Sequence, residues 1–245
     1  MENGLFAPTI FVLGTLTAAF VTGLAGFAFG LVAAAIWLYA LTPIQTTTLI
    51  AGYGLLVQGY AVWKLRHSIN LSRLAPLIIG SAIGVPFGIL LLRWVPPATL
   101  RAGIGLLLIG FSLYNLLRPA LPSAKEAGRL GDAGAGLING VVGGSTGLAG
   151  IVVVIWSSLR GWPRDEQRAA FQPTGVATFL MTLIGLGGIG AINRENAELF
   201  AIGLPALAIG TWGGWKLYGK LDERKFRIAV LVLLLLSGSA LIVTV

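Results

Sequence analysis

The residues whose types and spacing could do chemistry gather in two glycine-rich segments. The second segment reads GGST at residues 143–146, and Asn139 precedes it by about one helical turn. Glycines interrupt a helix, and each interruption leaves backbone N–H groups at the positive end of a helix dipole. Such groups bind anions, and hydroxyl and amide side chains add neutral donors. The candidate binding residues are Thr22, Gly23, Gly26, Asn139, Gly143, Gly144, Ser145, Thr146 and Gln172.

Composition excludes several other kinds of site. The chain has no cysteine and a single histidine, His67, in a charged loop, which argues against thiolate nucleophiles and His/Cys metal sites. All nine Asp and Glu residues fall in predicted loops or at the ends of apolar stretches. A buried proton relay and a cation pore are therefore disfavoured. We predict no metal, no cofactor and no enzymatic activity.

The elements that must position these residues are membrane helices. Of the 245 residues, 56% are hydrophobic and only 11% are charged, against about 25% charged in ordinary soluble domains. Several apolar stretches approach the roughly 20 residues that a membrane span needs. The net charge of +8 lies in short loops between these stretches, where orientation signals of membrane proteins lie, so nucleic-acid binding is not expected. The fold prediction is an all-α polytopic protein in the inner (plasma) membrane, with the lipid bilayer as a partner.

The two halves of the chain resemble each other. The longest polar stretch, residues 118–132, contains Pro, Gly and charges and reads as a cytoplasmic linker. It separates a first repeat, residues 1–117, from a second, residues 133–245, which together form one transport domain. The matching landmarks in chain order are Gly23, Gly26 and Gly30 with Gly140, Gly143 and Gly147; Pro43 with Pro163; Gly84 and Gly88 with Gly210 and Gly214; and Arg101 with Arg227.

Charge favours one topology over another. Segments 133–143 and 147–159 are each too short to span, so they form either one kinked span or a hairpin that enters and returns. The hairpin puts fourteen of the seventeen Lys and Arg on one side and leaves Arg93, Arg101 and Arg194 on the other. That bias is the one that insertion produces. Each half is then a broken or re-entrant hairpin plus three transmembrane helices, the repeats are inverted, and both termini lie outside. Whether segment 5–41 crosses fully or re-enters stays open.

The order of these motifs resembles one family. A broken helix, GLAGFAFGLVAAAIWLYALTP, precedes WKLRHSIN and PLIIGSAIGVPFGILLL, and the second half opens with GVVGGSTGLAGIVVVIWSSLRGWPRDEQRA. The chain resembles the sulfite exporter TauE/SafE family over nearly its whole length. The resemblance implies transport of small sulfur-containing anions, such as sulfite or organosulfonates, with export suggested by the family description. Members often carry Pro after the glycine of the second break, where this chain has Ile151.

Two interpretations compete for the glycines and hydroxyls. For Gly84, Gly88, Gly210 and Gly214 we favour close helix packing. For the glycines of the two breaks we favour a binding site, in which the breaks face each other near mid-membrane and Gln172 lies at a helix entrance. Thr and Ser side chains often bond only their own helix. A carrier working by alternating access is preferred to an anion channel and to a membrane assembly protein, and a homodimer is left open.

Overall fold

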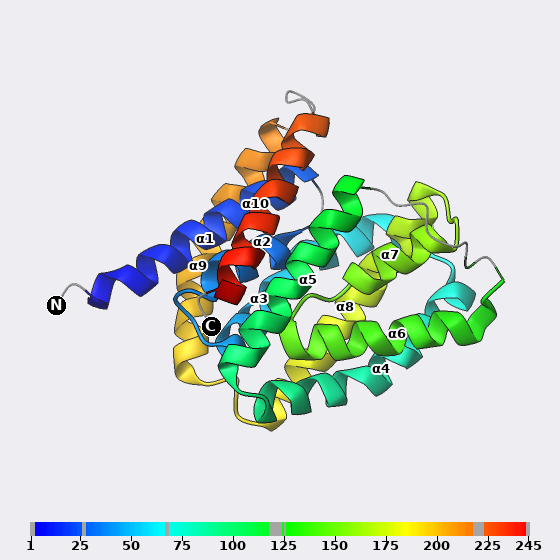
Figure 1. Cartoon of the computed structure of the whole chain (residues 1–245), viewed down its shortest axis with the longest axis horizontal. Helices are drawn as coiled ribbons and strands as arrows, with labels where there is room; N and C mark the ends of the chain where they lie inside the picture. The colour runs from blue at the N-terminus through cyan, green and yellow to red at the C-terminus, as the bar shows by residue number, and fades with distance from the viewer. Residues whose placement is uncertain are drawn as a thin grey trace. The chain divides into compact units, whose positions relative to one another are not determined.

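The computed structural model describes residues 3–25, 28–66, 69–117, 124, 126–217 and 223–243. Within these ranges the chain forms helices and no strand, so the all-α prediction is confirmed (Figure 1). The helices are α1 (Asn3–Ala25), α2 (Phe29–Trp37), α3 (Pro43–Leu65), α4 (Leu71–Trp94), α5 (Pro97–Leu117), α6 (Gly128–Thr146), α7 (Ile151–Leu159), α8 (Arg164–Gly188), α9 (Arg194–Leu217) and α10 (Glu223–Val243).

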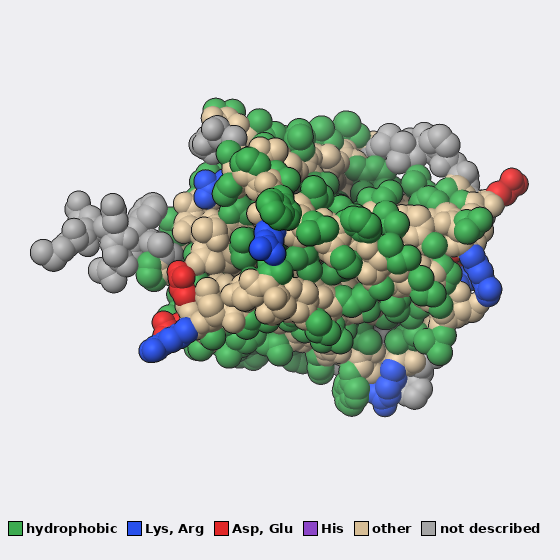
Figure 2. Space-filling model, turned by 90° about the horizontal axis from the view of Figure 1, so that it is seen from below, with side chains coloured by type: hydrophobic (Ala, Val, Ile, Leu, Met, Phe, Trp, Pro, Cys, Tyr) green, Lys and Arg blue, Asp and Glu red, His purple; other side chains and the backbone are tan. Residues whose placement is uncertain are grey.

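Among the described helices, α4, α5, α8, α9 and α10 contain stretches long and apolar enough to cross a membrane. Their outward faces carry large apolar side chains, such as Ile83 on α4 and Ile209 on α9, which are more than half exposed. Hydrophobic side chains cover most of the face drawn in Figure 2, with a few charged side chains among them. A surface of this kind is solvated by lipid, as expected of a multi-pass membrane protein.

The chain divides into two compact units, and each unit takes helices from both halves of the sequence. The first unit comprises Met1–Ile50, Val95–Pro119 and Asn193–Val245, and in it α1 packs along α9 and α5 along α10. The second comprises Ala51–Trp94 and Ala120–Ile192, and in it α4 packs along both α6 and α8. Helices that are far apart in sequence therefore lie side by side within each unit (Figure 1).

Glycines on α4 let its backbone approach that of α6. A methyl group added at Gly84 would collide with the carbonyl oxygen of Leu137, and one added at Gly88 would collide with that of Val141. Backbone atoms cannot move aside as a flexible side chain can. The close-packing interpretation of these two glycines is therefore confirmed.

The same arrangement recurs between α9 and α1 in the first unit. A methyl group at Gly210 would lie 2.5 Å from the carbonyl oxygen of Leu16, and one at Gly214 would collide with that of Phe20. Gly210 and Gly214 are the sequence mates of the α4 glycines. Each unit thus contains one glycine-dependent helix pair built from corresponding segments of the two halves.

These contacts change the alignment of the two breaks. A methyl group added at Gly23 would meet the carbonyl of Thr211 on α9, the residue after Gly210. A methyl group added at Gly144 would meet the carbonyl of Val85 on α4, the residue after Gly84. Packing therefore matches Gly23 with Gly144, whereas the sequence comparison matched it with Gly140. Gly140 and Gly144 lie about one helical turn apart on the same face, so glycine spacing alone cannot choose between them.

Candidate functional site: the break between α6 and α7

The second glycine-rich segment does contain a break, but the break lies later than the sequence predicted: GGST at 143–146 is still helical and forms the end of α6, and the chain leaves the helix only at Gly147. Helix α6 ends at Thr146, and both Gly147, with φ 73°, and Gly150, with φ 96°, adopt the left-handed conformation. Side chains rarely tolerate that conformation, which explains glycine at both positions. Helix α7 then begins at Ile151.

The first break uses a different residue for the same purpose. Ala28 precedes α2 with φ 84°, and among the described residues it is the single non-glycine with a positive φ. Its place immediately before α2 corresponds to that of Gly150 before α7. The predicted binding residue Gly26 lies outside the described residues.

Asn139 holds the second break in place. Its side chain is fully buried, and its Oδ1 accepts a hydrogen bond from the Gly150 N–H at 2.8 Å. Its Nδ2 donates to the hydroxyls of Ser81 on α4 and Thr178 on α8, both at 3.2 Å. Those hydroxyls in turn donate to the carbonyls of Gly136 and Thr174. One carboxamide therefore connects α4, α6, α8 and the turn before α7.

The predicted hydroxyl donors are already engaged. The Oγ of Ser145 donates to the Val141 carbonyl at 2.7 Å, and the Oγ1 of Thr146 donates to that of Val142 at 2.7 Å. Thr146 also accepts from the Leu148 N–H at 3.1 Å, which closes the turn that leaves α6. A hydroxyl has one proton, so neither side chain can donate to an anion while these bonds persist.

The first-half candidates behave similarly. Thr22 donates to the Ala18 carbonyl of its own helix at 2.7 Å, and Gly23 is packed against α9. In the second unit, the space beside Gly143 is filled by Thr178 and Ala149. At Gly23, Gly143 and Gly144, neighbouring protein atoms occupy the space that a side chain would need.

The donors that remain at the second break are backbone groups and one amide. The N–H groups of Ile151, Val152 and Val153 open α7 and so have no partner within that helix. A methyl group added at Gly150 would lie 3.7 Å from the Phe171 carbonyl, so α8 passes beside this end of α7. The next residue, Gln172, is only 8% exposed, and its Oε1 is buried without a hydrogen-bond partner. Backbone N–H groups could bind a small oxyanion together with the Nε2–H of Gln172, while the unpaired Oε1 can only accept a hydrogen bond and suits a donor group on the same ligand.

A buried ion pair joins the other ends of α6 and α7, which sequence reasoning missed. Asp132 is 4% exposed, and its Oδ1 lies 3.2 Å from Arg160 Nε and accepts a hydrogen bond from Trp156 Nε1 at 2.8 Å. Arg160 Nη1 also donates to the Ala124 carbonyl at 3.2 Å. From the sequence, Asp132 is grouped with the other acids, in predicted loops or at the ends of apolar stretches. Trp156 on α7 and Arg160, the residue that caps α7, are four residues apart and so lie on the same side of the helix end, which is the signal that could have located their acidic partner.

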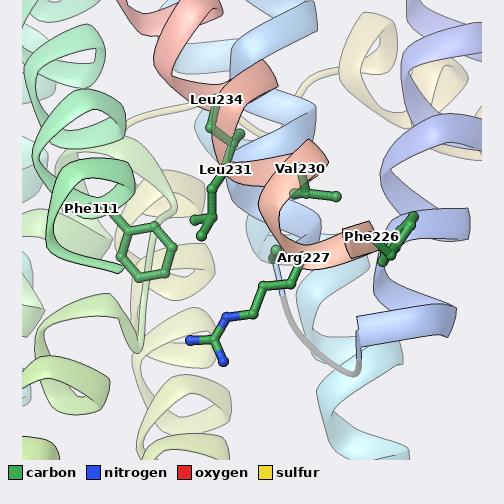
Figure 3. Close-up of a pocket in the computed structure, with 7 residues that line it drawn as sticks. Phe111, Phe226, Arg227, Val230, Leu231 and Leu234 are labelled. Carbon is green, nitrogen blue, oxygen red and sulfur yellow. The ribbon is translucent and has the colours of Figure 1, made fainter. Parts of the chain in front are cut away.

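The first unit offers a small apolar recess beside the first break. Ala28 and Phe111 line it together with residues from the start of α10, and Figure 3 shows Arg227 and Phe226 pointing in different directions from that helix. Arg227 donates to Asn115 Oδ1 at 3.0 Å. The recess holds about 10 Å³, room for about one water molecule. It is too small for a sulfonate.

Comparison with known proteins agrees with this helical architecture. No curated protein and no solved structure matches the chain. The profile of the family described as Sulfite exporter TauE/SafE matches residues 10–241, nearly the whole length. The chain therefore belongs to the sulfite exporter TauE/SafE family.

Proposed function

We propose that this protein is a carrier of small sulfur-containing anions, such as sulfite or organosulfonates, that works by alternating access. Its family comprises membrane transporters of sulfite and related sulfur anions. The observation that carries the proposal is the break between α6 and α7, which Asn139 ties down through the Gly150 N–H and which presents the first-turn N–H groups of α7 near the Gln172 carboxamide on α8. Interrupted helices at membrane depth are typical of transporter substrate sites.

The substrate binds, in this proposal, at the start of α7. The first-turn N–H groups of α7 and the Gln172 amide supply the donors, while Asn139, Ser145 and Thr146 fix the backbone that presents them. This division of roles follows from the hydrogen bonds of the second unit. It modifies the sequence prediction, in which the Ser145 and Thr146 hydroxyls touched the substrate directly.

A transport assay tests the proposal. Purified protein in liposomes should move sulfite, taurine or sulfoacetate faster than protein-free liposomes, with sulfate and thiosulfate completing the panel. Gln172→Leu should lower apparent affinity about ten- to a hundredfold, because a hydrogen bond to a charged ligand is lost. Gln167→Leu on the same helix is the matched control, since the Gln167 amide already donates to the Trp162 carbonyl. Equal transport by both variants would place the site elsewhere.

The proposal includes an inverted arrangement in the inner membrane with both termini outside. The chain contains no cysteine, so single cysteines can be introduced without background labelling. Leu130, which is 89% exposed and lies in the predicted cytoplasmic linker 118–132, and Ile192, which is 52% exposed before α9, are suitable positions. An impermeant thiol reagent applied to intact cells should label Ile192→Cys and not Leu130→Cys. Labelling of both positions from outside would refute this topology.

A further inference from the structure

Helices α3 and α8 meet through two contacts in the second unit. A methyl group added at Gly54 would lie 2.5 Å from the Phe179 ring, and one added at Gly175 would collide with Gln58 Oε1. From the first contact to the second, the residue number rises by four on α3 and falls by four on α8. They fix the register of an antiparallel pair, and in that register the Gln58 carboxamide occupies the notch left by Gly175.

This notch lies next to Gln172. Residues three apart on a helix are neighbours on its surface, so Gln172 and Gly175 face the same side of α8. The Oε1 atoms of Gln58 and Gln172 are both buried, and neither has a hydrogen-bond partner among the described residues. Leaving a buried carbonyl unpaired is costly, and proteins seldom do so twice in one place without a ligand or water to pair with it.

We propose that Gln58 and Gln172 form a carboxamide pair that binds the substrate and selects compounds with one singly charged sulfur oxyanion group and a hydrogen-bond donor of their own. This inference rests on the proposed transport function for the identity of the substrate. Hydrogensulfite, hydroxyalkanesulfonates and aminoalkanesulfonates belong to the selected class. Gly175 is the positioning residue, because it alone leaves room for the Gln58 amide.

The selectivity follows from the chemistry of the carboxamide. Each amide group presents N–H donors and a carbonyl acceptor, whichever way its plane is turned. A bare sulfonate accepts the N–H bonds and leaves the carbonyl oxygens unpaired. A ligand with a hydroxyl or ammonium group pairs both kinds of atom. A dianion such as sulfate brings a second charge to be desolvated, and two neutral amides do not compensate for it.

The experiment compares ligands of similar size with and without a donor. Binding of isethionate, taurine, ethanesulfonate, sulfate and thiosulfate to the detergent-solubilised full chain is measured by calorimetry, and transport is measured in liposomes. We expect isethionate and taurine to bind at least about tenfold more tightly than ethanesulfonate, the difference expected for one hydrogen bond. The two dianions should bind more weakly still.

Two variants assign the effect to the pair. Gly175→Ala displaces only the flexible end of the Gln58 side chain, so the protein should fold and lose the preference for donor-bearing ligands. Gln58→Leu should do the same. Gly188→Ala on α8 and Gly59→Ala on α3 are matched controls, because a methyl group at either position meets open space.

The outcomes are distinct. Unchanged selectivity in Gly175→Ala and Gln58→Leu would overturn the carboxamide pair, as would dianions that bind as tightly as isethionate, even if transport is intact. Selective binding that the two variants abolish would support the pair. If such binding occurs without flux in liposomes, the inference stands and the transport proposal fails.

Discussion

Replacing Asn139 by leucine should destabilise the second unit more than any other single amide substitution. The change keeps the number and branching of the side-chain heavy atoms, and it removes the acceptor for the Gly150 N–H and the donors to Ser81 and Thr178. At about 1 kcal/mol for each of these hydrogen bonds, and with the buried Gly150 N–H left unpaired, the expected loss is about 3–5 kcal/mol. At roughly 2–4 °C per kcal/mol for a chain of this size, the unfolding temperature should fall by about 10 °C.

The assay is thermal unfolding of purified protein in detergent, followed by tryptophan fluorescence or by aggregation. Asn115→Leu is the matched control, because Asn115 bonds its own helix and the exposed Arg227 side chain. Its unfolding temperature should fall by no more than a few degrees, about 1 kcal/mol in stability. If Asn139→Leu unfolds at the control's temperature, the connection of four segments through one carboxamide is not what holds the break.

Further predictions concern the hairpin and the glycine contacts. Asp132→Leu should destabilise the protein by about 3–5 kcal/mol, because Arg160, with only 14% of its side chain exposed, loses its carboxylate. The double variant with Arg160→Leu should recover much of this loss, and thermal unfolding of the three proteins gives the comparison. Gly88→Val should abolish folded protein in size-exclusion chromatography, since the new side chain meets the α6 backbone. Gly103→Val on α5 meets open space and should elute as the unaltered protein does.

The helical class, the existence of a second break and the packing glycines of α4 and α9 could be predicted from sequence, whereas the break itself lies just after GGST rather than within it. Apolar length predicts membrane helices, and glycines in a fixed order mark both a break and a close approach. Gly147 and Gly150 both carry positive φ values, which glycine adopts without strain. The pairing of the two breaks was displaced by one turn, because Gly140 and Gly144 share a helix face.

The roles within the site were less predictable, because they depend on which partner each polar atom finds. Sequence shows that Ser145 and Thr146 are potential donors, and only the structure shows that both donate to carbonyls of their own helix. The sequence shows Gln58 only as an amide in an apolar stretch, and its position over Gly175 depends on the register of two helices distant in sequence. Asp132 is the last residue of the predicted linker, whereas the structure places it in α6 and buries it against Arg160.

Counterflow in liposomes tests the central claim most directly. Vesicles containing the purified protein are loaded with unlabelled taurine or sulfite and diluted into a trace of the same labelled anion. A carrier with one alternately exposed site should accumulate label transiently above its external concentration, and Gln172→Leu should reduce that accumulation while Gln167→Leu leaves it intact. Label that only equilibrates, or that enters empty and loaded vesicles at equal rates, would contradict alternating access and indicate a channel; no entry of any sulfur anion would contradict the proposed function itself.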